Sequence, residues 1–361
     1  MKAVAVFPAE KQVRIVDHPE PGINSPDQVK LRMRNVGICG TDKEIVSFQY
    51  GTPPDGSEYL IIGHESLGEV VEAGNRQFKP GDLIIPTVRR PCPHPECIAC
   101  RSGRQDFCYT GDFTERGIKQ QHGYMAEFVV EDAAYLNLVP AALREIAVLV
   151  EPLTIAEKGL AQLMEVQQRL PWFQPGQGQE AVVLGAGPVG LLGAMALRVR
   201  GFEVFIYSRP GEDRQAIATA IGAKFINADE VTVDSVVNEF VTTLDVVYEA
   251  VGASSLAFDF LKALGPNGVF IFTGVPGRKA PVPVDTDLLM RDLVLKNQLL
   301  FGTVNAPKVS FEAAIADLGK FEAAWPGVTG RLISNRIPLE KALEPLAGKV
   351  PGIKNVIEIS S

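Results

Sequence analysis

The sequence offers little positive charge to an anionic partner. Acidic residues number 43 against 35 lysines and arginines, the net charge is −8, and the chain has no dense run of basic residues. Proteins that bind nucleic acids or anionic membranes through their surfaces usually carry basic patches. We therefore expect neither kind of partner and predict a small molecule as the ligand.

Long apolar runs are also missing. The N-terminal residues MKAVAVFPAEKQVRIV include no apolar block of signal-peptide length and no small-residue cleavage site. The longest uncharged apolar stretch, residues 181–197, reaches only the lower edge of membrane-spanning length, and its central GAGPVG would break a helix that faces lipid. These absences predict a cytoplasmic protein with no membrane-spanning segment.

Cysteine is scarce and unevenly distributed. Of the 5 cysteines, Cys39 stands alone and the others lie in CPHPECIACRSGRQDFC, residues 92–108. A reducing cytosol disfavours disulfides, although a pair of disulfides is the alternative interpretation of this segment. Four thiolates in one short loop can close a tetrahedral shell around a structural zinc ion, and we expect His94 in the first spacer to face solvent. The predicted structural zinc ligands are Cys92, Cys97, Cys100 and Cys108.

The pattern of the chain changes twice along its length. Up to about residue 155, short runs rich in valine and isoleucine are separated by glycine and proline, which is typical of short strands in a barrel-like β region. From about 156 to 305, strand-like runs alternate with helix-length stretches, which predicts a parallel, doubly wound sheet. The chain ends in a strand-like KNVIEI that can rejoin the first region. We predict an α/β protein with one domain of residues 1–155 and 306–361 and a second domain of residues 156–305.

A glycine-rich motif opens the second predicted domain. Gly185, Gly187 and Gly190 form G-x-G-x-x-G directly after the apolar run AVVL and directly before a helix-like segment. Glycines at these positions allow a tight turn and a close approach of pyrophosphate to the N-terminus of the helix. We predict dinucleotide binding by the whole loop, which comprises Gly185, Ala186, Gly187, Pro188, Val189 and Gly190.

The end of the following strand indicates which dinucleotide is preferred. Enzymes that prefer NAD usually have an acidic residue there, which binds the ribose 2′-hydroxyl group. In this chain the run EVFIY ends in Ser208 and Arg209. An arginine beside a hydroxyl group suits a 2′-phosphate, so we predict NADP over NAD, with NAD also accepted.

Cys39 and His64 suggest a second metal site. Cys39 lies in GICGTDKEI, and His64 and Glu65 lie in GHESLGEVVEAG. A lone cysteine or histidine more often fills a core than binds a metal. A thiolate, an imidazole and nearby carboxylates are nevertheless compatible with zinc, and fewer than four fixed ligands leave room for water or substrate.

The motifs together resemble a known family. GICGTD, GHESLGEVVEAG, FKPGDLIIP, the four-cysteine loop and LGAGPVG follow one another along the chain. In this order and at these distances they resemble the zinc-dependent medium-chain alcohol and polyol dehydrogenases over nearly the whole chain. The resemblance implies a chaperonin-10-like β-barrel catalytic domain that holds two zinc ions, together with a Rossmann domain.

The resemblance also implies a set of ligands for the catalytic zinc. Cys39 and His64 match fixed ligands, and Glu65 matches an adjacent carboxylate that can enter or leave the coordination shell. Alcohol dehydrogenases use a second cysteine as the third fixed ligand, but the matching segment here, VLVEPLTIAEKG, has Glu151 instead, as polyol and sugar dehydrogenases can. A carboxylate in place of a thiolate makes the metal harder, which suits a polyhydroxylated substrate.

Two further residues match supporting roles in the family. Thr41 matches the hydroxyl group that relays the proton of the substrate alcohol, and it also contacts the substrate. Asp42 matches the acid that orients the histidine ligand.

A narrower resemblance concerns the substrate. RRPC, CRSGRQDFCYTGDFTERGI, LVEPLTIAEKGL and FGTVNAPK resemble the zinc-dependent glucose 1-dehydrogenases of archaeal type. By this resemblance Glu115, Asn305 and the ligand Glu151 contact the sugar. The further cofactor residues that it implies are Phe272, Thr273, Gly274, Thr303, Val304 and Asn305.

Three departures from the family pattern concern the structural zinc, the sugar and the cofactor. The first cysteine spacer has four residues where the family usually has two, and such an insertion can bulge without moving the ligands. Val88 stands where sugar-specific relatives can have an asparagine that touches the substrate. Pro210 follows Arg209 where relatives can have a second arginine for the 2′-phosphate.

These observations together predict an NAD(P)-dependent aldose 1-dehydrogenase. It would oxidise the C1 hydroxyl group of a sugar such as glucose or galactose to the lactone, with two zinc ions per chain. A polyol dehydrogenase of the sorbitol type is the nearest alternative, and a catalytically silent dinucleotide-binding relative is another. The retained Cys39, Thr41, His64 and Glu151 favour an enzyme. The resemblance also implies a homodimer or homotetramer.

Overall fold

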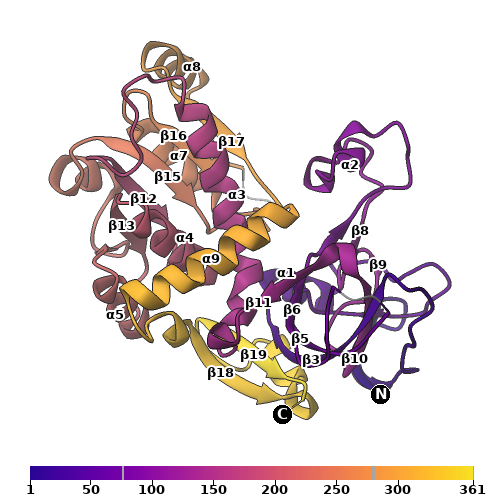
Figure 1. Ribbon diagram of the computed structural model, residues 1–361. Helices are drawn as coiled ribbons and strands as arrows, with labels where there is room; N and C mark the ends of the chain where they lie inside the picture. The colour runs from indigo at the N-terminus through magenta and orange to yellow at the C-terminus, as the bar shows by residue number, and fades with distance from the viewer. Residues whose placement is uncertain (75–76, 278–280, 361) are drawn as a thin grey trace. The chain divides into compact units, whose positions relative to one another are not determined.

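The computed structural model describes residues 1–74, 77–277 and 281–360 and forms two compact units (Figure 1). Unit 1 comprises Met1–Thr154, Asn305–Gly319 and Ile333–Ser361, and unit 2 comprises Ile155–Val304 and Lys320–Leu332. The sequence placed all of 306–361 in the first domain, whereas residues 320–332 group with unit 2. The reason is that helix α9 (Lys308–Ala324) continues without a break past the point where the grouping changes.

Unit 1 is built mainly from sheets. One has three strands, another seven and a third three. In order, the first contains β2 (Gln12–Asp17), β1 (Lys2–Phe7) and β4 (Leu60–Ile61). The second contains β11 (Leu136–Val139), β6 (Leu83–Pro86), β5 (Glu65–Ala73), β3 (Gln28–Gly37), β19 (Lys354–Glu358) and β18 (Ile333–Pro338), with β10 (Phe128–Asp132) also paired to β3. The third contains β7 (Arg89–Arg90), β8 (Thr114–Arg116) and β9 (Gln120–Gln121).

In β3, an inner strand of the large sheet, buried and exposed residues alternate. Along this strand Val29, Leu31 and Met33 are buried, while the residues between them are partly or fully exposed. Side chains of a strand point alternately to the two faces of its sheet, so this pattern buries one face. β19 pairs with β3 although more than 300 positions separate them in the sequence, so the chain end rejoins the first sheet region as expected.

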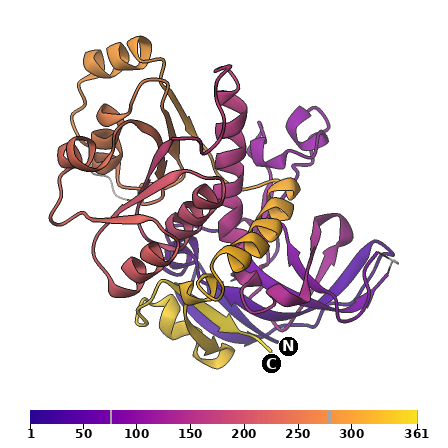
Figure 2. The same cartoon turned by 60° about the vertical axis from the view of Figure 1, so that its left-hand side comes forward.

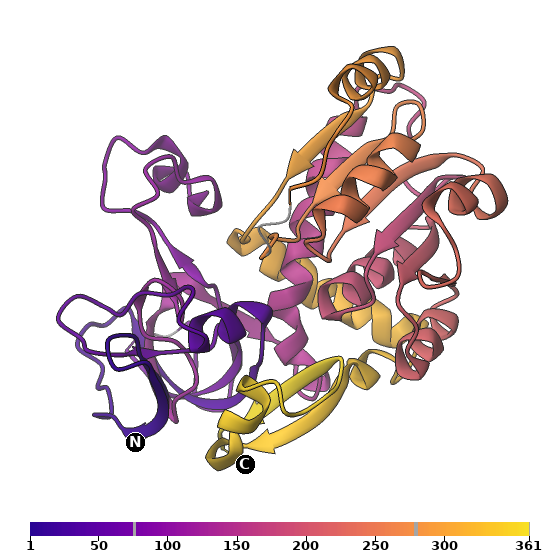
Figure 3. The same ribbon diagram turned by 180° about the vertical axis from the view of Figure 1, so that it is seen from behind.

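Short helices and one lobe complete unit 1. The cysteine-rich segment leaves the small sheet at β7 and returns at β8, and Figures 1 and 3 show it as a lobe that projects from the rest of the unit. The α-helices are α1 (Gly40–Val46), α2 (Ile98–Arg101) in the lobe, the first turn of α3 (Val150–Gln167), α9 as far as Gly319, and α10 (Leu343–Leu346).

Unit 2 contains a six-stranded parallel sheet in the order β14-β13-β12-β15-β16-β17. This is the strand order of a doubly wound dinucleotide-binding fold, which reverses direction at the first strand of the motif. Helices lie on both faces of the sheet, as Figures 2 and 3 show. The strands are β12 (Glu180–Leu184), β13 (Glu203–Ser208), β14 (Lys224–Asn227), β15 (Leu244–Glu249), β16 (Val269–Phe272) and β17 (Leu299–Gly302). The α-helices are α3 from Ile155 onward, α4 (Pro188–Val199), α5 (Glu212–Ala220), α6 (Val233–Ser235), α7 (Ser254–Ala263), α8 (Thr286–Leu295) and the end of α9.

The strands of unit 2 are continuous apolar runs because both of their faces are covered. In β12 the four residues Ala181–Leu184 are all fully buried. Strands enclosed by helices on both sides lose the alternation seen in β3. Phe205, Phe260 and Phe270 form part of one buried cluster between sheet and helices. Among the helices of the described residues, none is both long and apolar enough to cross a membrane.

Candidate active site and cofactor site

Three potential metal ligands meet in unit 1. Cys39 caps the N-terminus of α1, His64 immediately precedes β5, and Glu65 is the first residue of that strand. One ligand atom from each lies within 4.8 Å of the others. Strand pairing of β5 with β3 places the histidine and the carboxylate beside the loop that carries the cysteine.

Asp42 organises the cysteine and the histidine. Its Oδ2 accepts a hydrogen bond from the backbone N–H of Cys39 at 2.8 Å. Its Oδ1 lies 3.6 Å from Nδ1 of His64, and both atoms are buried without a hydrogen-bond partner. Burial lowers the pKa of His64, but the charges of Asp42 and Cys39 outweigh it and raise the pKa well above its usual value. Asp42 thus faces Nδ1, which leaves Nε2 as the metal-binding nitrogen.

Glu151 interacts with His64 and Glu65, but it is not one of the three residues whose ligand atoms lie within 4.8 Å of one another. It stands in the first turn of α3 and is almost fully buried. Burial is the main reason why its pKa is raised to about 7; His64 and Lys354 lower it, while Glu65 raises it. A buried carboxyl group whose charge is only partly balanced by nearby positive groups is suited to binding a cation. A thiol, an imidazole and a carboxylate are all zinc ligands. The donor set therefore fits zinc.

Thr41 places a hydroxyl group beside Cys39. Its Oγ1 lies 3.8 Å from Sγ of Cys39, and Thr41 stands in the first turn of the short helix that Cys39 caps. The side chain is only partly buried. A hydroxyl beside the proposed metal ligand is in a position to hold a proton of a bound alcohol.

Lys354 is a buried residue of this site that the sequence did not predict. Its Nζ donates hydrogen bonds to Oε2 of Glu65 at 2.5 Å and to the carbonyl oxygen of Ile38 at 3.1 Å. Gly37 leaves room for this carboxylate, because a Cβ atom there would collide with Oε2. A lysine in an apolar strand near the chain end gives no sequence signal of its partner, which lies 289 positions away.

The lobe brings the other four cysteines together. Potential ligand atoms of all four lie within 4.8 Å of one another, and the Sγ atoms of Cys97 and Cys108 are 4.0 Å apart. A zinc ion with four sulfur ligands at 2.3 Å separates neighbouring sulfurs by about 3.8 Å. All five cysteines of the chain are unpaired, so the alternative of two disulfides is not what the structure contains.

The environment of these sulfurs favours thiolates in part of the set. Burial raises the pKa of Cys108, but hydrogen bonds from Thr110 and Gly111 outweigh it and lower the pKa to about 6. Burial raises the pKa of Cys100 to about 12. Four sulfurs this close cannot all carry charge without a cation, so the lobe fits a structural zinc ion. His94 stands aside and pairs with Asp112, Nε2 to Oδ2, at 2.8 Å.

Glu115 and Asn305, the predicted sugar contacts, lie together in unit 1. Oε1 of Glu115 accepts a hydrogen bond from Nδ2 of Asn305 at 3.1 Å. The sequence offered no reason to expect Glu115 to be buried, yet only 5% of it is exposed. It is buried because Arg89, which the sequence reasoning missed, forms an ion pair with it at 3.0 Å. Asn305 has a backbone φ of 58°, a left-handed conformation that asparagine tolerates better than most residues.

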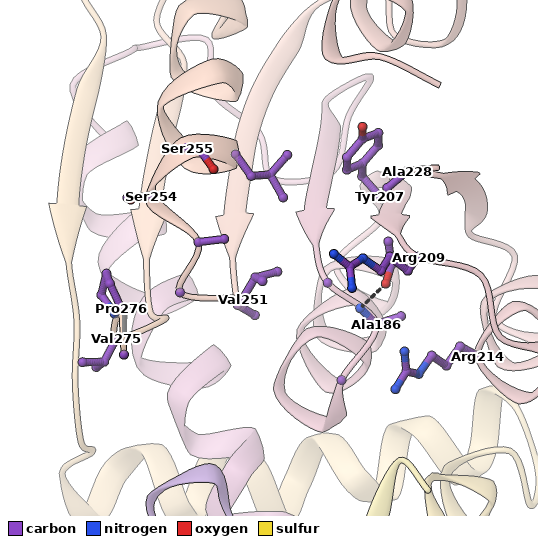
Figure 4. Close-up of a pocket in the computed structure, with 18 of the residues that line it drawn as sticks. Ala186, Tyr207, Arg209, Arg214, Ala228, Val251, Ser254, Ser255, Val275 and Pro276 are labelled. Atoms are coloured by element: carbon purple, nitrogen blue, oxygen red, sulfur yellow. Dashed lines mark hydrogen bonds between the residues drawn. The ribbon is translucent and has the colours of Figure 1, made fainter. Parts of the chain in front are cut away.

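Unit 2 has a cavity of about 880 Å³ at the carboxyl ends of its strands (Figure 4). Gly185, Ala186 and Gly187 line it together with Ser208 and Arg209. The hydroxyl oxygen of Ser208 accepts a hydrogen bond from the backbone N–H of Ala186 at 3.2 Å, which ties the glycine-rich loop to the end of β13. In doubly wound sheets, ligands bind at this edge.

The glycines of the loop serve different purposes. Gly185 has a φ of 96°, which other residues rarely adopt. A Cβ atom at Gly190 would collide with the carbonyl oxygen of Gly185, so that glycine allows α4 to pack against the turn. A Cβ atom at Gly187 would meet nothing within 4 Å, so the space beside it is open to a ligand. Pro188 and Val189 begin α4 and do not line the cavity.

The remaining predicted cofactor residues follow β16 and β17. Phe272 ends β16, while Thr303 and Val304 follow β17. Both Thr273 and Gly274 are held by Glu249, a buried residue that the sequence analysis missed. Oγ1 of Thr273 donates to its carbonyl oxygen at 2.7 Å, and the N–H of Gly274 donates to its Oε2 at 3.1 Å.

Two arginines border the cavity near the end of β13. Arg209 was expected there; Arg214, in the first turns of α5, was not. Figure 4 shows both on the same side of the cavity. Among the described residues neither has a hydrogen bond or an ion pair, so both guanidinium groups are available to an anion. Arg214 supplies the second positive charge that Pro210 cannot provide.

The fold and these two sites define a class. A doubly wound dinucleotide-binding unit combined with a β unit that carries a cysteine, histidine and carboxylate site is the architecture of metal-type alcohol dehydrogenases. Comparison with known families agrees: residues 25–141 match the alcohol dehydrogenase GroES-like domain, and residues 144–359 match the glucose dehydrogenase C-terminus.

Curated relatives and solved structures extend the match over the full chain. The glucose 1-dehydrogenase of Methanocella arvoryzae is 42% identical over 100% of both chains. That of Metallosphaera sedula is 40% identical over 99% of this chain and 98% of its own. The structure of Haloferax mediterranei glucose dehydrogenase in complex with NADP, Zn and gluconolactone aligns over 100% of both chains with a TM-score of 0.89 and 32% identity.

The chain belongs to the zinc-type medium-chain dehydrogenases, in the branch of the archaeal-type glucose dehydrogenases. This confirms the family resemblance and the fold class predicted from the sequence, including the GroES-like first domain.

Proposed function

We propose that this chain oxidises the C1 hydroxyl group of an aldose such as glucose or galactose to the lactone, with NADP as the preferred oxidant. The observation that carries the proposal is the donor set of unit 1, in which Cys39, His64 and Glu65 gather and the buried carboxyl group of Glu151 interacts with His64 and Glu65. It is supported by relatives named glucose 1-dehydrogenase and by a similar structure that contains NADP, Zn and gluconolactone.

Cys39, His64 and Glu151 would hold the catalytic zinc, with Glu65 able to approach it. Glu65 is paired with Lys354, so its charge is already compensated and it is the weakest candidate for a fixed ligand. The four cysteines of the lobe would hold a second, structural zinc, which has no open position for a substrate.

The reaction balances as aldose plus NADP⁺ giving lactone plus NADPH and a proton. When bound, zinc supplies Lewis acidity to the C1 oxygen and NADP⁺ accepts the hydride. Thr41 would accept the C1 hydroxyl proton at Oγ1 and pass it on. Glu115 and Asn305 would orient the ring by accepting and donating hydrogen bonds to its other hydroxyl groups.

The glycine-rich loop would hold the pyrophosphate of NADP at the N-terminus of α4. Ser208, Arg209 and Arg214 would surround the 2′-phosphate, and among the described residues no acidic side chain lines the cavity to favour NAD. The residues after β16 and β17 would border the nicotinamide.

A homo-oligomer, either a dimer or a tetramer, is also proposed. β17 is an edge strand of the parallel sheet, and the nearby helix α8 has no buried residue. An edge strand beside an apolar helix face can continue its sheet in a second copy. The exposed apolar residues of α8 are Leu288, Met290, Val294 and Leu295. The cytoplasm is the proposed compartment, since reducing conditions keep the lobe cysteines available to zinc.

The experiment is a substrate panel with metal analysis. The purified chain should reduce NADP⁺ with glucose or galactose more efficiently than with sorbitol, and contain about two zinc ions per chain. Cys39→Ser should lose one zinc and at least about a hundredfold in kcat, which is the scale of removing a metal contribution. A Cys39→Ser protein with unchanged activity after treatment with a chelator would contradict the metal role. A preference for sorbitol would favour the polyol alternative.

A further inference from the structure

Arg89 makes the strongest contacts of Glu115. Its Nε donates a hydrogen bond to Oε1 of the carboxylate at 3.0 Å, and Nη2 lies 3.0 Å from the same oxygen in the ion pair. Both side chains are buried, with 7% of Arg89 exposed. Charge-assisted hydrogen bonds shielded from water in this way hold a carboxylate in one orientation.

Asn305 supplies a second hydrogen bond to the same oxygen. Its Nδ2 lies 3.1 Å from Oε1, while its Oδ1 accepts from the N–H of Ala306 at 2.9 Å and fixes the amide. Within the described residues no hydrogen bond is made to Oε2 of Glu115. The two hydrogen bonds and the ion pair therefore concentrate on Oε1 and leave the other oxygen available to a ligand.

The other side of Arg89 is anchored to the four-cysteine lobe. Its Nη1 donates to the carbonyl oxygen of Asp106 at 3.3 Å, and Nε2 of Gln105 donates to the carbonyl oxygen of Arg89 at 3.4 Å. The ring of Phe113 lies beneath the guanidinium, with its centroid 3.6 Å from Cζ. Gln105 and Asp106 lie between Cys100 and Cys108, so the lobe that gathers the cysteines also fixes the arginine.

We propose that Arg89 is a positioning residue for substrate recognition, which fixes Glu115 so that Oε2 faces the sugar and which couples this carboxylate to the four-cysteine lobe. The inference rests on the proposed function, which assigns Glu115 to the sugar. Arginine suits the role because its planar fork reaches the carboxylate, the carbonyl oxygen and the aromatic ring at once. A lysine offers one point charge and cannot keep all three contacts.

The four-cysteine lobe thereby also takes part in substrate recognition. A lobe without catalytic ligands would otherwise contribute only stability. Through Arg89, its folding sets the orientation of a side chain that binds substrate. Loosening the arginine should therefore weaken sugar binding while hydride transfer from correctly bound sugar continues.

The test is a double-mutant cycle in the zinc-loaded, full-length protein. Arg89→Lys should raise KM for the preferred aldose about tenfold, as expected for losing a charge-assisted hydrogen bond, with little change in kcat. Glu115→Gln should also raise KM. If Arg89 acts through Glu115, adding Arg89→Lys to Glu115→Gln should raise KM no further. The dissociation constant of NADPH, measured by fluorescence, should be the same in all four proteins.

Two more variants provide a second test and a control. Phe113→Leu loosens the guanidinium without touching Glu115, and should raise KM about threefold, as expected when a cation–π contact is weakened. This effect too should vanish in the Glu115→Gln background, which keeps the proposal testable if Arg89→Lys does not fold. Arg101→Lys is the control, because Arg101 is an exposed residue of the same lobe with no side-chain hydrogen bond among the described residues.

The outcomes separate the two proposals. Equal effects of Arg89→Lys with and without Glu115→Gln, or no effect on KM, would overturn the positioning role and leave aldose oxidation intact. If the chain oxidises a polyol but no aldose, the proposed function fails, and the same cycle on the polyol decides the role of Arg89. If the chain oxidises no alcohol of the panel, both proposals fall.

Discussion

The buried Nζ of Lys354 lies 2.5 Å from Oε2 of Glu65, so the last strand of the chain neutralises a carboxylate of the proposed zinc site. Burial lowers the pKa of Lys354, but Glu65 and Cys39 outweigh it and raise the pKa above its usual value. The lysine therefore stays charged, and Glu65 is held by an ion pair before any metal binds.

Replacing this lysine should destabilise the fold through the charge it leaves behind. Lys354→Met should lower the free energy of unfolding by about 3–5 kcal/mol, because Glu65 would become a buried, unpaired carboxylate. Urea denaturation of the zinc-loaded protein measures this, with Lys341→Met at an exposed lysine as the control. Adding Glu65→Gln should restore part of the loss. A double variant no more stable than Lys354→Met would show that the ion pair is not the cause.

Two glycines of the same motif should respond differently to alanine. Gly190→Ala should lower the free energy of unfolding by about 1–3 kcal/mol, because its Cβ atom would overlap the carbonyl oxygen of Gly185. Gly187→Ala should leave stability nearly unchanged, since its Cβ atom meets nothing within 4 Å, yet should weaken NADPH binding. Thermal unfolding and calorimetric titration distinguish the two effects. Full NADPH affinity in Gly187→Ala would argue against pyrophosphate at this loop.

Arg214 should contribute to the preference for NADP. Arg214→Met should weaken NADPH about 10- to 100-fold, the range expected for one hydrogen bond to a charged group, and leave NADH unchanged. Arg209→Met should behave in the same way. Titration of both nucleotides against both variants measures the effect. Equal losses for NADPH and NADH would place these arginines away from the 2′-phosphate.

His122 should make the stability of unit 1 depend on pH. Nδ1 of His122 accepts a hydrogen bond from the N–H of Ile61 at 3.1 Å, and His18 lies against its ring. Burial, with smaller contributions from His18 and Arg116, lowers the pKa of His122 from 6.5 to about 4. The unfolded chain therefore binds the proton first, and the free energy of unfolding should fall as pH drops from about 6.5 to 4.

The matched variant is His122→Asn, which keeps an acceptor for Ile61 and does not titrate. Its unfolding free energy should change less over this pH range than that of the wild type. His94→Asn, at a partly exposed histidine of the lobe, is the comparison. Parallel pH profiles for wild type and His122→Asn would contradict this assignment.

Local motifs in the sequence predicted most of the second unit. The glycine motif after an apolar strand, followed by alternating strands and helices, predicts a doubly wound sheet because each step depends on neighbouring residues. The clustering of Cys92, Cys97, Cys100 and Cys108 was equally local. The lack of an acid after EVFIY likewise pointed to Arg209, which lines the cavity.

Contacts between distant residues were beyond such reasoning. Glu65 and Lys354 are 289 positions apart, and Glu115 and Asn305 are 190 apart, so neither pair leaves a pattern in either segment. Arg89 sits in a polar run that reads as surface, yet folding of the lobe buries it. The change from unit 1 to unit 2 within α9 could not be predicted for another reason, because a continuous helix has no turn residues that mark a boundary.

The proposed activity is tested most directly with a sugar that lacks only the reacting group. Initial rates of NADPH formation should be compared for glucose, 1,5-anhydroglucitol and sorbitol with the zinc-loaded protein. If the chain oxidises an aldose at C1, glucose should be turned over to the lactone, while 1,5-anhydroglucitol, which has the same ring without the C1 hydroxyl group, should give no NADPH. Turnover of 1,5-anhydroglucitol, or a kcat/KM for sorbitol equal to that for glucose, would contradict the proposed reaction.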